Sequence, residues 1–226
     1  MFVIVRQERL DDVKRTRLLE AALEEFAERG IESASYNKII ERSGLSKGTV
    51  YYYFDNKDTL LDTVLDVICR SFLDAIGDFR LPDTKEEYWE TAWEYHKRSI
   101  QFFFENPLLA RVLFWVSRDG VCIDEHMGAA HDRLTRFMDD LLVRGQEIGA
   151  VRSDLPIRTI HKLMHSMGKV FFSEVLEENR LYGEEADWYA SRSEIQAKVE
   201  AIVMMVHDLS KRILTPEEDL SCLEDY

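Results

Sequence analysis

The sequence predicts an all-α protein, and three observations support this fold class. Only 10 glycines and 4 prolines occur among 226 residues, too few for the many tight turns of an all-β chain. Apolar residues recur at spacings of three and four along most of the chain, the period of an amphipathic helix. Helix-ending residues such as Gly30, Gly44, Pro107 and Gly149 separate these stretches. We therefore expect about nine helices in all, arranged in one or two domains.

Three helices are expected in the first quarter of the chain. The apolar positions 19, 22, 23 and 26 predict a helix over 12–29, which Gly30 ends. A short helix follows the capping hydroxyl of Ser35 and ends at Gly44. Ser46 caps the next one, over 46–54. Two short helices joined by a tight turn and supported by longer ones form a helix-turn-helix, with 46–54 as the candidate recognition helix.

The recognition candidate carries side chains that suit DNA. Val50 and Phe54 are four residues apart and are expected to face inward, which leaves the other positions outside: Lys47, Gly48, Thr49, Tyr51, Tyr52 and Tyr53. Lysine and tyrosine can reach phosphate oxygens, and threonine can contact base edges. Glycine allows a close approach of the backbone. The alternative is that the three tyrosines belong to the core or to an interface.

Charge is distributed unevenly along the chain. The net charge of −14 taken as a whole argues against nucleic acid. Residues 1–60 carry a net charge of only −1, whereas residues 61–226 carry −13. Contact with DNA through the N-terminal segment alone is compatible with this distribution. A basic cluster near the start, either an arm for the minor groove or a solvated face, consists of Arg6, Arg9, Lys14, Arg15 and Arg17.

A resemblance to a known family rests on the segment 40–60. It reads Ile40, Ser43-Gly44-Leu45-Ser46-Lys47-Gly48-Thr49-Val50-Tyr51-Tyr52-Tyr53-Phe54, Lys57 and Leu60. This order of residues resembles the DNA-binding segment of TetR-family transcriptional regulators, and the similarity covers about residues 12–65. The resemblance implies a helix-turn-helix domain over 1–56 and a helical ligand-binding and dimerisation domain over 57–226.

The resemblance also implies roles for single residues. Ser35 would contact phosphate at the start of its helix, and the amides behind Ser46 could do the same. Lys47, Gly48 and Thr49 would enter the major groove, Tyr51, Tyr52 and Tyr53 would contact phosphates or base edges, and Lys57 would anchor the DNA backbone. Lys38 departs from the family pattern, because many members carry an acid there that completes a capping box with the residue at position 35.

Six more helices are expected in the rest of the chain, at about 57–79, 84–105, 107–117, 124–148, 156–181 and 190–214. The last two carry broad apolar stripes and are expected to pair with those of a second copy as a four-helix bundle. The predicted dimer contacts are Ile160, Met164, Phe171, Ile195, Val199, Ile202 and Val206. The alternative is that both faces belong to the core of one chain. In such a dimer, the helix-turn-helix domains of the two copies (the two heads) would read a palindromic operator in double-stranded DNA.

The helices beyond residue 57 are rich in aromatic residues, which suits an apolar or aromatic small molecule. The chosen pocket residues are Trp93, Phe114, Trp115, Met138 and Met167. Such a ligand would release a repressor from its operator. Aromatic residues at helical spacing are also common in cores, and the competing function is a DNA-bound interaction protein whose body recruits a protein partner and holds no inducer.

No catalytic motif, cofactor fingerprint or apolar run of about 18 residues occurs, so we predict neither an enzyme nor a cofactor nor a membrane span. His161 and His165 share a helix face, and Cys122 and His126 share a loop, but neither pair has an evident third ligand. We therefore predict no metal site. Three scattered cysteines favour a reduced cytoplasmic location.

Overall fold

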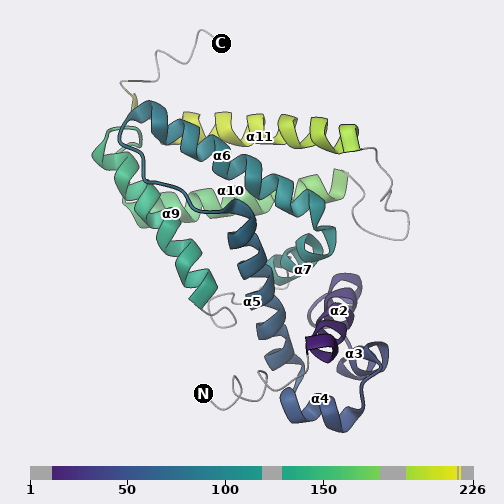
Figure 1. The fold of residues 1–226 in the computed structure, drawn as a ribbon. Coiled ribbons are helices and arrows are strands. Elements are labelled where there is room, and N and C mark those ends of the chain that lie inside the picture. The colour runs from purple at the N-terminus through teal and green to yellow at the C-terminus, as the bar shows by residue number, and fades with distance from the viewer. Residues whose placement is uncertain (1–11, 119–128, 179–191, 218, 220–226) are drawn as a thin grey trace. The chain divides into compact units, whose positions relative to one another are not determined.

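The computed structural model describes residues 12–118, 129–178, 192–217 and 219 (Figure 1). Nine helices and no strand occur in this part of the chain, which confirms the all-α prediction. The helices are α2 (Asp12–Arg29), α3 (Tyr36–Ser43), α4 (Lys47–Tyr53), α5 (Lys57–Ile76), α6 (Lys85–Glu105), α7 (Pro107–Arg118), α9 (Ala129–Glu147), α10 (Ile157–Glu178) and α11 (Arg192–Leu214). Their bounds follow the expected ranges to within about five residues.

The chain forms two compact units, and the boundary between them lies within α5. The described parts of unit 1 belong to the segments Met1–Ser71 and Asn106–His131, and those of unit 2 to Phe72–Glu105 and Asp132–Tyr226. Unit 1 therefore holds α7 beside the three helices of the predicted helix-turn-helix. This division by packing differs from the functional boundary expected at residue 56, which stays a prediction.

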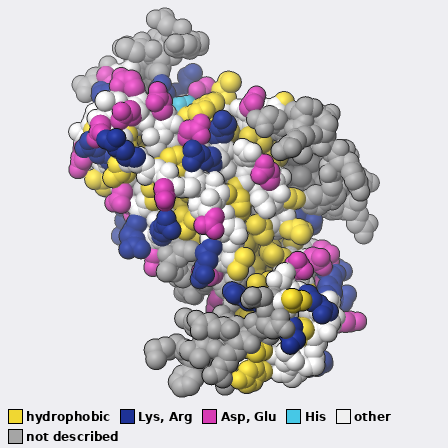
Figure 2. Space-filling model, in the orientation of Figure 1, with side chains coloured by type: hydrophobic (Ala, Val, Ile, Leu, Met, Phe, Trp, Pro, Cys, Tyr) yellow, Lys and Arg dark blue, Asp and Glu magenta, His cyan; other side chains and the backbone are white. Residues whose placement is uncertain are grey.

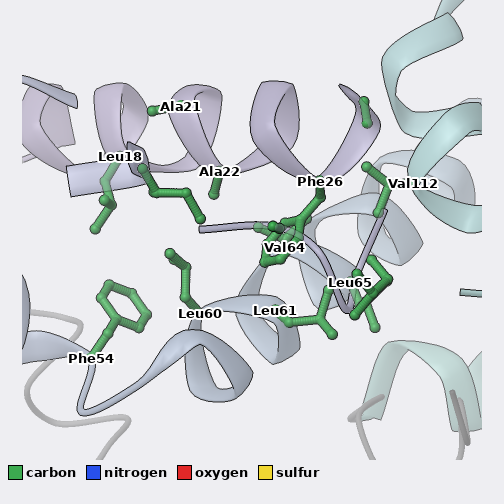
Figure 3. Close-up of a cluster of buried hydrophobic side chains, with 14 of the residues drawn as sticks. Leu18, Ala21, Ala22, Phe26, Phe54, Leu60, Leu61, Val64, Leu65 and Val112 are labelled. Carbon is green, nitrogen blue, oxygen red and sulfur yellow. The ribbon is translucent and has the colours of Figure 1, made fainter. Parts of the chain in front are cut away.

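The core of unit 1 forms where α2, α5 and α7 converge. Figure 3 shows Leu18, Ala22 and Phe26 of α2 facing Leu60, Leu61, Val64 and Leu65 of α5, with Val112 of α7 at one end. Phe26, Leu60 and Leu65 are completely buried. A fully buried side chain of this size contributes about 1.5–3 kcal/mol through removal of apolar surface from water. The short helices α3 and α4 pack against this core.

Unit 2 is built on extensive packing of α6 against α11. Its second cluster of buried side chains includes Tyr88, Leu141, Leu142, Val151, Ile160 and Leu214. The turn after α9 has no room for a side chain at position 145, because a Cβ there would lie 2.5 Å from both the Tyr88 ring and the Val151 side chain. Gln146 closes this turn by donating to the carbonyl oxygens of Arg152 (2.8 Å) and Leu155 (3.0 Å). Figure 2 shows acidic and basic side chains interspersed with hydrophobic ones on the surface of the molecule. No helix in the described ranges is long and apolar enough to cross a membrane.

Candidate DNA-binding surface and ligand pocket

Helix α4 is fixed at both ends by hydrogen bonds. At its start, the Ser46 hydroxyl accepts from the backbone N–H of Thr49 (3.1 Å) and lies 2.7 Å from the Thr49 hydroxyl. At its end, the Tyr36 hydroxyl donates to the carbonyl oxygen of Phe54 (2.7 Å). Burial raises the pKa of Tyr36 to about 12, and the neighbouring Tyr51 and Asp55 add to the increase, so this donor stays protonated. Val50 and Phe54 are buried, as expected.

The turn before α4 requires Gly44. This residue ends α3 in the left-handed conformation, with φ of 65°, and a Cβ there would come within 2.4 Å of the Arg17 guanidinium. Any other residue would combine backbone strain with this clash. The turn therefore sets the angle at which α4 leaves α3.

The start of α3 replaces the missing acid at position 38 with a residue from α2. Ser35 is the N-cap, and its hydroxyl accepts from the Lys38 N–H (3.4 Å). The Ser35 N–H donates to Glu25 Oε1 (3.0 Å), the bond that a capping-box acid would otherwise accept. Glu25 is only 1% exposed. A tertiary contact thus satisfies the cap that the local sequence leaves open.

Arg42 ties α3 to α2. Its guanidinium donates to Glu28 at 2.8 Å and lies 3.8 Å from a carboxylate oxygen of both Glu24 and Glu25. The hydrogen bond to Arg42 lowers the pKa of Glu28, and the same bond raises the pKa of Arg42. Arg42 thereby holds α3 against α2.

The predicted DNA contacts differ in accessibility. Ser46, Lys47 and Gly48 are exposed, and Tyr51 and Tyr52 are 46% and 47% exposed. Ser35, Thr49 and Tyr53 are half-buried, and Tyr53 packs against the core of unit 1. These residues form one surface on and beside α4, which lies at the edge of unit 1 in Figure 1.

Lys57 is hydrogen-bonded within unit 1. Its ammonium donates to three backbone carbonyl oxygens, those of Ile31 (2.7 Å), Glu32 (2.9 Å) and Ala34 (3.1 Å). An ammonium has three N–H donors, so all of them are used. The side chain thus fixes the connection between α2 and α3 to the start of α5, and the expected contact of Lys57 with the DNA backbone stays a prediction.

Comparison with known proteins agrees with this arrangement. The family model of bacterial regulatory proteins of the tetR family matches residues 18–64, which run from α2 into α5. The HTH-type transcriptional repressor AcnR of Corynebacterium glutamicum is 24% identical over 164 residues, 71% of this chain and 81% of AcnR. Residues 18–64 thus match the DNA-binding segment of the TetR family, and the matches together support a transcriptional regulator.

Two solved structures share the fold of this chain. A TetR family transcriptional regulator from Chloroflexus aurantiacus superposes with a TM-score of 0.64 at 22% identity, covering 93% of this chain and 97% of the other. The transcriptional regulator FadR from Bacillus subtilis, solved in complex with stearoyl-CoA, has a TM-score of 0.62 at 16% identity and covers 84% and 96%.

A pocket in unit 2 includes one of the five predicted ligand residues. It has a volume of about 550 Å³ and is lined by Glu86, Trp89, Glu90, Trp93, Glu94, His207 and Lys211. Met138 and Met167 are half-buried on α9 and α10 and do not line it. Phe114 and Trp115 belong to unit 1, where the Trp115 indole N–H donates to the Ala27 carbonyl oxygen (3.0 Å). Trp115 is thus a packing residue of unit 1. Sequence reasoning missed the acids at positions 86, 90 and 94, whose spacing of four was the only signal that could have marked them as one face of α6.

The predicted dimer contacts are only partly accessible. Ile160 is completely buried and Val199 is 2% exposed, so both belong to the interior of a single chain. Met164, Ile202 and Val206 are half-buried, and the side chains of Phe171 and Ile195 lie outside the described part. Four residues on the same two helices that sequence reasoning missed are more exposed: Leu163 (48%), Val170 (57%), Met204 (56%) and Met205 (48%).

The candidate metal pair His161 and His165 gains no third ligand in the part of the chain that the structure describes. His161 Nδ1 lies 2.5 Å from Asp139 Oδ1, and no group of three His, Cys, Asp or Glu side chains suited to a metal occurs among the described residues. Cys122 and His126 lie outside the described residues, as do Arg6 and Arg9.

Proposed function

We propose that this regulator is a repressor that binds a palindromic operator as a homodimer and leaves it when a small molecule binds unit 2. The observation that carries the proposal is the exposed surface of α4, with Lys47, Gly48, Tyr51 and Tyr52, on a helix capped at both ends. A rigid helix of this length matches the width of a major groove. The similar protein AcnR is itself a repressor. Such a protein acts where the DNA is, so we expect it in the cytoplasm.

The proposed dimer contact uses α10 and α11. Exposed apolar side chains on these helices include Leu163, Val170, Met204 and Met205. Burying them against a second copy removes apolar surface from water at about 25 cal/mol per Å². A two-fold pair would place two recognition helices about one turn of DNA apart, ~34 Å, on a palindromic site.

The proposed ligand response works through α5. This helix supplies Leu60, Leu61 and Leu65 to the core of unit 1 and continues to Ile76 in unit 2. A ligand that binds one arrangement of unit 2 more tightly than another shifts the spacing of the two heads. The relative FadR was solved with stearoyl-CoA, and the pocket on α6 and α11 gives this chain a place for a ligand. The pocket favours a protein that binds an inducer over the alternative, a DNA-bound protein whose unit 2 only recruits protein partners.

The test begins by selecting an operator from a random duplex library with the full chain. Binding of wild-type protein and variants is then measured by fluorescence anisotropy on that operator and on a scrambled duplex. Tyr52→Phe is expected to weaken binding to both by about threefold to tenfold, because it removes one hydroxyl for phosphate. Thr49→Val is expected to weaken operator binding alone.

Leu108→Ser, an exposed position on α7 of unit 1, serves as the control and should leave both affinities unchanged. A selected library with no common palindromic sequence would refute the proposed operator. Equal losses on operator and scrambled duplex in Thr49→Val would remove Thr49 from sequence recognition.

A further inference from the structure

The pocket on α6 and α11 is a hollow open to solvent with an unusual lining. Its volume of about 550 Å³ lies within the range of about 300–1,000 Å³ found for small-molecule pockets. Two tryptophans and a histidine supply aromatic surface, and the charged residues are three glutamates and one lysine. Both the aromatic and the charged groups restrict which molecules can bind.

The carboxylates lie on one side of α6. Glu86, Glu90 and Glu94 follow each other at intervals of four, which places them along one face of the helix. Glu94 lies 3.4 Å from Arg98 and 3.8 Å from Lys97. Glu86 and Glu90 form no ion pair within the described part of the chain. Because these two cations offset the charge of Glu94, the two remaining carboxylates stand against the single ammonium of Lys211, which leaves the lining with a small excess of negative charge.

The chain already places a cation of its own against one tryptophan of the pocket. Lys211 Nζ lies 5.8 Å from the centroid of the Trp89 ring, within the ~6 Å range of a cation–π contact. The Trp93 ring adds a second aromatic surface, 5.2 Å from the His207 ring and nearly perpendicular to it. The pocket thus has the aromatic faces and the carboxylates by which proteins hold organic cations.

His207 completes the aromatic lining of the pocket. The residue is 9% exposed and its ring packs against those of the two tryptophans and of His96, while its buried Nδ1 has no hydrogen-bond partner in the described residues. Burial lowers the pKa of His207, the nearby Lys211 lowers it further, and Asp208 opposes the change. The ring is therefore neutral at pH 7 and adds no positive charge that would repel a cation.

We propose that this pocket binds an organic cation with a flat apolar body, which packs on Trp89 and Trp93 and places its charge beside Glu86 and Glu90. A neutral apolar molecule of the same shape lacks the attraction of the carboxylates, and an anion is repelled by them. Binding itself is independent of DNA. Only the release of an operator by such a cation rests on the proposed function.

The test is isothermal titration calorimetry of the full chain with three probes of similar shape and different charge. N-methylquinolinium is the cation, 2-naphthalenemethanol the neutral probe and 2-naphthoate the anion. We expect the cation to bind about tenfold more tightly than the neutral probe and the anion to give no binding. Raising NaCl from 50 to 500 mM should weaken the binding of the cation by several-fold and leave the affinity for the neutral probe unchanged.

Variants locate the site. Glu86→Gln with Glu90→Gln should weaken the cation about tenfold with little effect on the neutral probe, and Lys211→Gln should tighten the cation by removing the competing ammonium. Glu105→Gln is the matched control, because it is an exposed acid on α6 that does not line the pocket. Thermal melts establish that each variant is folded.

Equal affinity for cation and neutral probe, no binding of any probe, or a double variant that binds like wild type would each overturn the proposal. Operator binding of the unliganded protein is measured separately by anisotropy. If the cation does not bind but the protein still binds its operator, the cation site is refuted and the proposed function is not. A protein that binds the cation but no operator refutes the proposed function and leaves the site standing.

Discussion

Unit 1 and unit 2 differ in how some of their charged residues are placed. In unit 1, Glu25, Arg42 and Lys57 are all engaged with partners inside the unit, where they fix α3 and α5 to the rest of it. In unit 2, Glu86 and Glu90 line a pocket without an ion pair among the described residues. Unit 1 is thus organised to present one fixed surface, whereas unit 2 keeps groups available for something that binds it.

The comparison extends to apolar side chains. The largest exposed ones on the recognition helix of unit 1 are tyrosines, Tyr51 and Tyr52, which carry hydroxyls for polar contacts. Those on α10 and α11 of unit 2 are aliphatic or methionine. Water-exposed phenols suit phosphates, and exposed aliphatic groups suit a second protein surface. The difference agrees with the proposed DNA contact of one unit and the proposed self-association of the other.

The largest effect is expected from charging the proposed dimer face. Leu163→Glu with Met204→Glu should convert the dimer to a monomer, because two carboxylates would be buried without partners. Loss of the paired heads should weaken operator binding about 100-fold, since each head then binds alone. Native mass spectrometry counts the subunits, and anisotropy measures the affinity. Val143→Glu, an exposed position on α9, is the control. A double variant that stays dimeric would place the contact elsewhere.

A second test asks whether Lys57 supports the fold or DNA. Lys57→Ala should lower the free energy of unfolding by about 2 kcal/mol, because three carbonyl oxygens lose a charged donor. Urea denaturation measures the change. Lys38→Ala, at an exposed position on α3, is the control and should change the free energy of unfolding by less than about 0.5 kcal/mol. Unchanged stability together with weaker binding to every duplex would support the phosphate role.

The third prediction concerns pH and unit 2. Burial lowers the pKa of His96 to about 4, and His207 contributes to this shift. An unfolded histidine has a pKa near 6.5, so between about pH 6.5 and 4 the unfolded chain binds a proton that the folded chain does not. Acidification therefore lowers stability. We expect a loss of about 2 kcal/mol between pH 7.5 and 5.

Chemical denaturation at several pH values measures this loss, and His96→Gln should flatten the dependence. Glu28 and Asp154 have lowered pKa values, so they add to the loss only as the pH approaches about 4. A wild-type curve that is flat from pH 7.5 to 5 would contradict the buried neutral histidine.

The smallest effect on the fold, and the sharpest separation of fold from function, is expected at Gly48. A Cβ at this position would meet no atom within 4 Å, so Gly48→Ala should stabilise α4 by about 0.5–1 kcal/mol. The same methyl group should weaken operator binding if the backbone approaches DNA closely. Gly168→Ala, equally unobstructed on α10, is the control for stability. Stabilisation without any loss of affinity would remove Gly48 from the DNA surface.

Sequence reasoning located the helices because capping residues and apolar spacing are local. Ser35, Ser46 and Gly44 have the capping roles that their types predict. It could not place Lys57, because whether an ammonium meets a phosphate or three carbonyl oxygens depends on residues 23–26 positions away. It chose Ile160 and Val199 as dimer contacts because periodicity identifies an apolar face and not what covers it.

The sequence by itself determined an all-α chain with a helix-turn-helix near its start and the order of its helices, since these follow from short-range spacing and caps. Only the tertiary structure decided which charges are internal and which face a pocket. Glu25 substitutes for an absent capping acid, and Trp115 packs on α2 instead of forming a ligand site. Such assignments depend on which helices meet, and that is set by the packing of the whole core rather than by any one segment.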